Sequence, residues 1–140
     1  MTDVVDERHL AAPPDVVWRA LTSAEELERW FWPEQLATTA QADVRVGGRY
    51  RIASPVAEMA VSGAYATVRP GELLEFGWQW DGEELASTVV IELTAAAESG
   101  TVLTVTHSGL AASELDSHIQ GWSDCLDRLP GHVTATGQAG

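Results

Sequence analysis

The clearest pattern in the chain is an alternation of apolar and polar positions between residues 42 and 107. Residues 74–80, 89–93 and 103–107 each place apolar or aromatic side chains at every second position. A period of two with one apolar face predicts strands of a sheet that packs on one side and faces water on the other. Gly next to Gly, Pro, Asp or Ser allows the positive φ of a tight turn. Such pairs stand at 47–48, 70–71, 81–82 and 99–100, so the region predicts an antiparallel meander.

The first forty residues predict one strand and two short helices. Residues 2–10 alternate loosely and predict the strand, and a helix is expected at 15–21 because proline is tolerated in a first helical turn. Ser23 and Glu26 have the spacing of a capping box, in which each side chain bonds the backbone amide of the other. A second helix is therefore predicted after Ser23. Pro33 is expected to end it, and residues 34–41 are expected to form a loop.

The last element is predicted to be one long helix. Its apolar stripe has spacings of four, three, four and three residues, which predicts a helix of about five turns. The stripe consists of Leu115, Ile119, Trp122, Leu126 and Leu129. Ser113 is expected to cap the helix, and Pro130-Gly131 is expected to end it. We expect one domain over residues 1–132 and a flexible tail over 133–140.

This order of elements constrains the architecture. One amphipathic helix cannot cover six or seven strands if the sheet is flat, but it can if the twisted sheet curls around it. Such a wrap leaves a gap between sheet and helix unless large side chains fill it.

Charge and composition narrow the class of protein. The 140 residues include 8 basic and 21 acidic side chains, for a net charge of −13, which argues against binding to nucleic acid or to an anionic membrane surface. All the basic residues are Arg, so Schiff-base, pyridoxal phosphate and phosphate-loop lysine chemistry is excluded. Arg8, Arg49 and Arg51 are interpreted as surface charge. No metal-ligand spacing is present, so neither a metal nor a cofactor is expected.

The cellular compartment of the protein is predicted from three further features. No apolar run approaches the roughly 20 residues of a membrane helix, and the N-terminus has no basic segment of a signal peptide. The single cysteine, Cys125, cannot form an internal disulfide. We therefore expect a cytoplasmic protein.

A series of short motifs resembles one known superfamily. The motifs are Ala-Pro-Pro-Asp-Val-Val-Trp-Arg-Ala-Leu-Thr at 12–22, Leu-Glu-Arg-Trp at 27–30, Pro-Glu at 33–34, Asp-Val-Arg-Val-Gly-Gly at 43–48, Gly-Thr at 100–101, His-Ser-Gly at 107–109 and Gly-Trp at 121–122. In this order they resemble the START-like (SRPBCC) superfamily, within it the subgroup similar to the activator of the heat-shock ATPase.

The resemblance covers about residues 4–129 and implies a fold and a cavity. The implied fold is the α+β helix-grip (START/Bet v-like) architecture: a seven-stranded antiparallel sheet wrapped around a long C-terminal helix, with two short helices after the first strand. Members of the superfamily hold lipids, sterols or plant metabolites between sheet and helix, and some cyclise polyketides.

Six tryptophans are the most unusual feature of the composition. Each can simply fill a core, since an aromatic side chain buries about 150–250 Å², and this interpretation is favoured for Trp18, Trp30 and Trp122. The resemblance instead places Trp32, Trp78 and Trp80 at the cavity mouth, where aromatic walls suit an apolar or aromatic ligand. The full set predicted to contact a ligand is Trp32, Tyr50, Met59, Tyr65, Phe76, Trp78, Trp80, Ile91, His107, His118, Trp122 and Cys125.

The best candidates for proton transfer are His118, Tyr50 and Tyr65. An imidazole with a pKa of about 6.5 suits general acid–base work, and a cavity tyrosine can orient a carbonyl or enol oxygen. The alternatives are a partly exposed histidine on the helix flank and two core tyrosines. His107 is interpreted as structural.

Two positions near His118 on the predicted helix are given structural interpretations. Cys125 is interpreted as a small buried apolar residue, because His118 lies about 10 Å away along the helix. Gly121 is interpreted as a close-packing position, with room for a ligand as the alternative.

Three functions remain open at this point. The first is a binding module for a small hydrophobic or aromatic molecule. The second is a cavity enzyme of the cyclase, dehydratase or lyase type that acts on a polyketide-like or other secondary metabolite, since positioning alone can lower a barrier by several kcal/mol. The third is a protein-interaction module of the co-chaperone type, by analogy of fold. A homodimer is compatible with the sequence but not required by it.

Overall fold

The computed structural model describes residues 3–139 and consists of one sheet and a set of helices on one side of it. Its elements are β1 (Val4–Leu10), α1 (Pro14–Thr22), α2 (Ala24–Trp30), η1 (Glu34–Leu36), β2 (Thr39–Ala42), β3 (Arg49–Ser54), β4 (Met59–Arg69), β5 (Leu73–Trp80), β6 (Ser87–Ala96), η2 (Ala97–Ser99), β7 (Gly100–Ser108), η3 (Ala112–Glu114) and α3 (Leu115–Ala139). Within the described residues, no helix combines the length and apolar character that a membrane-spanning segment needs.

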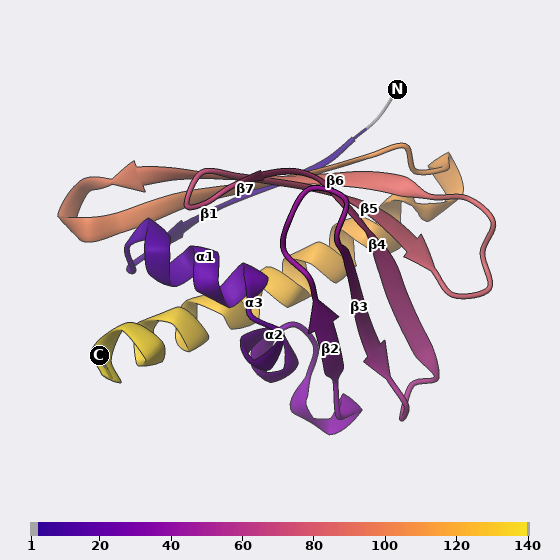
Figure 1. The fold of residues 1–140 in the computed structure, drawn as a ribbon, viewed down its shortest axis with the longest axis horizontal. Coiled ribbons are helices and arrows are strands. Elements are labelled where there is room, and N and C mark those ends of the chain that lie inside the picture. The colour runs from indigo at the N-terminus through magenta and orange to yellow at the C-terminus, as the bar shows by residue number, and fades with distance from the viewer. Residues whose placement is uncertain (1–2, 140) are drawn as a thin grey trace.

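The seven strands form one antiparallel sheet in the order β1-β7-β6-β5-β4-β3-β2. Strands β2 to β7 follow one another as a meander, and β1 closes the order by pairing with β7. Figure 1 shows the sheet curving around α3, with α1 and α2 on the same side of the sheet as α3. The predicted helix-grip fold, its two short helices and its meander are confirmed.

The junction of β4 and β5 contributes to the curvature of the sheet. The register shifts between Tyr65 and Thr67, and such a bulge bends a strand and increases its twist. Two residues earlier, Gly63 lies so close to β5 that an added Cβ would come within 2.1 Å of the Gly77 carbonyl oxygen. Only glycine permits this approach of the two backbones.

The core lies between the concave face of the sheet and α3. The helix buries Trp122, Cys125, Leu126, Leu129 and Val133 there. The predicted stripe is wrong at Ile119, whose side chain is 51% exposed. The helix presents the face that includes half-buried His118 to the sheet instead.

The end of α3 also differs from the prediction. The helix does not stop at Pro130-Gly131 but continues to Ala139. Pro130 removes one backbone donor, yet buried Leu129 and Val133 on either side keep this part of the helix against the core. At the other end, Ser113 lies within the short η3 turn rather than at the helix cap. Gly140, the last residue of the predicted tail, lies outside the described residues, and the flexibility of that tail stays a prediction.

Two loop predictions need correction, and one turn was not predicted. The predicted loop at 34–41 contains η1 and most of β2, and Glu28 Oε2 accepts a hydrogen bond from the Ala40 amide at 2.9 Å. The turn at 99–100 takes its positive φ from Glu98 and Ser99, because Gly100 has a φ of −93°. A further turn between β3 and β4 has a positive φ at Glu58 and no Gly to mark it in the sequence.

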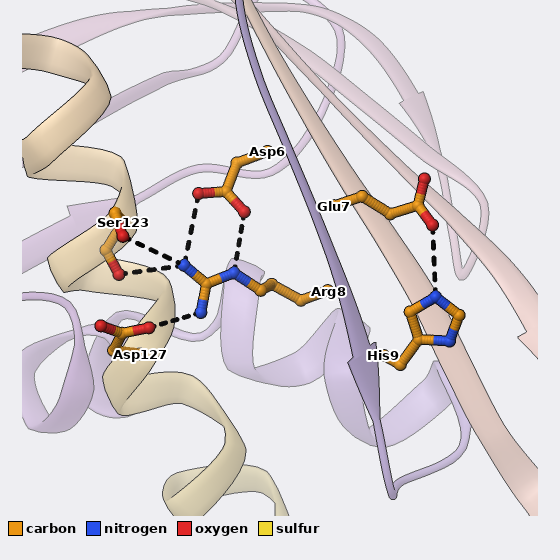
Figure 2. A network of polar contacts seen from close by, with 6 residues as sticks. All are labelled: Asp6, Glu7, Arg8, His9, Ser123 and Asp127. Atoms are coloured by element: carbon orange, nitrogen blue, oxygen red, sulfur yellow. Dashed lines mark hydrogen bonds and ion pairs between the residues drawn. The ribbon is translucent and has the colours of Figure 1, made fainter. Parts of the chain in front are cut away.

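Arg8 ties the edge strand β1 to α3. Its guanidinium bonds Asp6 on the same strand and reaches Asp127 and the Ser123 carbonyl oxygen on the helix. Figure 2 shows Asp6 and Arg8 on the helix side of β1, and Glu7 and His9 on the other side. Arg8 is therefore not simple surface charge. Arg49 and Arg51 are exposed, as predicted, and Arg51 pairs with Asp81.

Candidate functional site

A cleft of about 390 Å³ opens between the end of α2, strands β4 and β5 and the first turns of α3. This volume is within the range of small-molecule sites. Exposed Glu83, Ser117 and Gly121 form part of its rim. The lining residues are Phe31, Trp32, Met59, Trp78, Trp80, Glu83, Glu114, Ser117, His118, Gly121, Trp122 and Cys125.

Aromatic rings form much of the cleft wall. Trp32 and Trp80 stack with ring centroids 6.2 Å apart and planes at 10°. Trp78 packs edge-on against Trp80 at 5.4 Å and lies 5.3 Å from Trp122. The rings come together because Trp78 and Trp80 point to the same face of β5, while Trp32 follows α2 and Trp122 belongs to α3. The wall is apolar, with an indole N–H on each ring.

Gly121 lies on the open side of the cleft. An added Cβ there would have nothing within 4 Å, so the interpretation of Gly121 as a close-packing position is wrong. The glycine leaves space beside the helix, which was the alternative interpretation.

The hydrogen bonds of His118 define its tautomer. Nδ1 lies 2.9 Å from the Glu114 carbonyl oxygen, which can only accept, so Nδ1 carries the proton. Nε2 accepts a hydrogen bond from the Trp80 indole N–H at 3.2 Å. His118 is thus a neutral imidazole in the cleft wall, and its one lone pair, on Nε2, is engaged by the Trp80 N–H.

His107 lies behind the cleft wall and is part of a buried chain of hydrogen bonds. The Trp122 indole N–H donates to Nδ1 at 2.9 Å, and Nε2 lies 2.6 Å from Ser87 Oγ. Ser87 in turn donates to the Trp78 carbonyl oxygen. Burial, and then the neighbouring His118, lower the pKa of His107 to about 4. The ring is therefore neutral near pH 7 and orients Trp122.

Both tyrosines lie in a second, smaller cavity. Its volume is about 30 Å³, about the share of liquid volume of one water molecule. Tyr50 donates to the Gly77 carbonyl oxygen at 2.6 Å, and burial raises the pKa of Tyr50 far above its usual range. Burial also raises the pKa of Tyr65 to about 12. Phe76 and Ile91 line the same inner cavity.

The structure thus divides the predicted ligand-contacting residues between two cavities. Seven line the open cleft: Trp32, Met59, Trp78, Trp80, His118, Trp122 and Cys125. Phe31, Trp78 and Trp122 border both cavities. His107 lines neither of them. The three candidates for proton transfer are therefore not together, because His118 faces the cleft while the two tyrosines face the inner cavity.

Cys125 forms part of the cleft floor without being reactive. Its side chain is buried, and burial raises the pKa of the Cys125 thiol well above its usual range. A thiol in this state is a poor nucleophile, which agrees with the interpretation of Cys125 as a small apolar residue.

Sequence reasoning missed the two acidic residues of the cleft, Glu83 and Glu114. Glu114, His118, Gly121 and Cys125 are spaced four, three and four residues apart and lie on one face of η3 and α3. This face is displaced by one position from the apolar stripe, so the helical period could have identified it. Glu83 comes from the loop after β5, which no periodicity could have placed there. Within the described residues, no group of His, Cys, Asp and Glu side chains could hold a metal ion.

A comparison with protein families finds one match over most of the chain. The profile of the family described as "Activator of Hsp90 ATPase homolog 1-like protein" matches residues 11–134. No curated protein matches the chain significantly.

Several solved structures are similar to this chain. Protein CV1439 from Chromobacterium violaceum is 25% identical with a TM-score of 0.82, covering 95% of this chain and 98% of its own. DynU16, a protein in the dynemicin biosynthetic locus, is 27% identical with a TM-score of 0.82, covering 96% of this chain and 48% of its own. An HSP90 activator from Plasmodium falciparum, PFC0360w, is 22% identical with a TM-score of 0.74 over 91% of this chain and 92% of its own, which shows a common fold.

Proposed function

This chain belongs to the family of Activator of Hsp90 ATPase homolog 1-like proteins, whose SRPBCC fold typically has a ligand cavity, and we propose that it binds a small hydrophobic or aromatic molecule in the open cleft. The observation that carries the proposal is the combination of volume and lining. A cleft of about 390 Å³ walled by four tryptophans can enclose most of a ligand with one or two rings.

The local structure supports this function over a merely incomplete core. Gly121 leaves an opening on an otherwise regular helix, at a cost of about 1 kcal/mol relative to alanine. The ring of Trp80 is held by His118, and the ring of Trp122 is held by His107. Two walls of the cleft are therefore oriented before any ligand arrives, which reduces the entropy lost on binding.

The test is a titration followed by tryptophan fluorescence, with a panel of apolar and aromatic metabolites. We expect saturable quenching by at least one compound, and mass spectrometry of the mixture should show the compound unchanged. Gly121→Leu should weaken this binding by about tenfold or more, because the added side chain occupies the opening.

Gly131→Leu is the matched control for this variant. Gly131 lies on the same helix, also with nothing within 4 Å of an added Cβ, and does not line the cleft. Both substitutions raise helix propensity, so a loss of binding in Gly121→Leu alone assigns the effect to the cleft. Equal affinity in the two variants, or no saturable response to the whole panel, contradicts the proposal.

One observation favours a second candidate function. His118 places a neutral imidazole in the cleft wall, and one similar protein is named for a biosynthetic locus. A cavity enzyme of the cyclase, dehydratase or lyase type would hold a polyketide-like chain in the cleft and use His118 to move a proton. It would first have to displace the Trp80 N–H from Nε2.

The same incubation distinguishes the enzyme from the binding module. A new product mass favours the enzyme, and His118→Gln should then reduce turnover by about a hundredfold or more with little change in ligand affinity. Equal loss of both quantities would make His118 a ligand contact only.

A further inference from the structure

We propose that the molecule bound in the cleft is a cation, an ammonium compound with an aromatic or compact alkyl group, and this inference rests on the binding function proposed above. The reason is the distribution of charge around the cleft. Its lining residues include two acidic ones, Glu83 and Glu114, and one histidine, but no arginine. The chain contains no lysine.

The two carboxylates are available to a ligand. Among the residues that the structure describes, neither Glu83 nor Glu114 forms an ion pair. They belong to different elements, the loop after β5 and η3, and both contribute to the same cleft. A cation in the cleft would therefore meet negative charge, and an anion would be repelled.

The aromatic wall provides the second attraction. Indole faces carry negative electrostatic potential and attract ammonium groups within about 6 Å of the ring centre, and tryptophan does so best. The wall contains the stacked pair of Trp32 and Trp80, with Trp78 at a right angle to Trp80. Rings at a right angle and carboxylates on the same cleft together form a site for a positively charged group.

Two arginines that contact elements bordering the cleft are engaged elsewhere. Arg128 donates to the carbonyl oxygens of Trp30 and Phe31, and its guanidinium does not line the cleft. Arg51 pairs with Asp81 at the start of the loop that contains Glu83. A carboxylate-bearing ligand would therefore find no guanidinium in the cleft, which disfavours fatty acids and other anionic metabolites.

The test uses three probes of similar size and different charge. They are benzyltrimethylammonium, its uncharged carbon isostere neopentylbenzene, and the anion 3-phenylpropanoate. Binding is followed by tryptophan fluorescence at low ionic strength. We expect the cation to bind about five- to thirtyfold more tightly than the isostere and the anion to bind most weakly. The preference should shrink as salt is added, because exposed carboxylates are screened.

Charge-removing variants assign the preference to the cleft. The double variant Glu83→Gln/Glu114→Gln keeps the shape of both side chains. It should weaken binding of the cation by about tenfold and leave the affinity for the isostere unchanged. Glu84→Gln is the matched control, since Glu84 is the next residue in the same loop and does not line the cleft. It should change neither affinity by more than about twofold.

The outcomes separate this inference from the binding function. Equal or tighter binding of the isostere or the anion overturns the cationic ligand but leaves the binding function intact. An equal loss in Glu84→Gln and in the double variant also overturns it, because the effect would then come from net charge. If none of the three probes binds, the inference is wrong, and the wider panel with Gly121→Leu decides the binding function separately.

Discussion

The rings of His107 and His118 have centroids 5.2 Å apart, yet their hydrogen bonds give them different roles. His107 accepts from Trp122 and contacts Ser87, so its ring is fully buried and holds one cleft wall. His118 is half-buried, lines the cleft and accepts from Trp80. At the residue scale, one histidine supports the site and the other forms part of it.

The lowered pKa of His107 predicts a loss of stability in mild acid. The folded protein has a His107 pKa of about 4 and the unfolded chain about 6.5, so the unfolded state binds more protons between these values. The neutral His107 therefore makes its full contribution to the free energy of unfolding above pH 6.5. This contribution decreases as the pH falls to about 4, by up to about 3 kcal/mol in total. Urea unfolding between pH 7 and pH 4.5 measures it. His107→Gln should show a flatter dependence over this range, and parallel curves would contradict the assignment.

The indole N–H groups of Trp122 and Trp78 predict unequal effects of the same substitution. Trp122→Phe removes the donor to His107 and leaves a buried nitrogen unpaired, whereas the Trp78 N–H has no partner among the described residues. We expect Trp122→Phe to lower the free energy of unfolding by about 1–3 kcal/mol more than Trp78→Phe. Chemical denaturation of the two variants makes the comparison. Equal losses would mean that the bond to His107 adds nothing to the packing of the ring.

At the scale of elements, the β4–β5 pair and α3 position the cleft. The two strands approach closely at Gly63 and Gly77, and Gly77 directly precedes the strand end that carries Trp78 and Trp80. Helix α3 contributes a mixed face, in which buried Trp122 and Cys125 stand beside His118 and open Gly121. The cleft exists because an aromatic strand end meets a part of the helix that carries a glycine.

The two glycines of the β4–β5 pair predict opposite tolerance of a methyl group. In Gly63→Ala the new Cβ meets the Gly77 carbonyl oxygen at 2.1 Å, and backbone cannot yield as a side chain can. We expect a loss of about 2–4 kcal/mol in unfolding free energy. In Gly77→Ala the nearest atom is at 3.8 Å, and the change should stay within about 0.5 kcal/mol. Thermal or urea unfolding tests both, and a tolerated Gly63→Ala would show that the strands can separate at low cost.

At the scale of the whole molecule, a few polar contacts join the helices to one another and to the sheet. Arg8 joins β1 to α3. Glu26 joins all three α-helices, because one carboxylate oxygen lies 2.9 Å from His132 Nε2 and the other 3.0 Å from Arg19 Nε. The capping box is therefore only half formed: Ser23 Oγ accepts from the Glu26 amide at 3.4 Å, but the Glu26 side chain is used elsewhere.

Removal of the Glu26 charge should weaken the helical layer as a whole. Glu26→Gln keeps the size of the side chain but breaks contacts to two helices in a buried place, with an expected cost of about 1–3 kcal/mol. Glu25→Gln is the control, because Glu25 is exposed on the same helix and should change stability by less than about 0.5 kcal/mol. Urea unfolding of both variants gives the difference. Equal effects would assign the loss to helix charge rather than to the contacts between helices.

The sequence by itself determined most of the elements, their order and the overall architecture. Alternation in β5, β6 and β7, the serine cap of α2 and the apolar spacing of α3 are local patterns, and local patterns follow directly from strand and helix periods. The family resemblance, rather than these periods, pointed to Trp32, Trp78 and Trp80 as cavity residues, and all three line the cleft. The shared face of Trp78 and Trp80 needed only the two-residue period of a strand.

Only the tertiary structure decided which face of α3 meets the cleft and which residues share a cavity. Ile119 and His118 are adjacent, and either could face the sheet by helical spacing alone. In the folded protein His118 lines the cleft, while Ile119 is exposed. Tyr50 and Tyr65 have inward positions in the sequence, but the rings of Trp78 and Trp122 border their cavity and separate it from the cleft. Glu83 and Glu114 line the same cleft although they are 31 positions apart in the chain. Such meetings depend on the twist of the sheet and on side-chain packing between distant elements, which no local period contains.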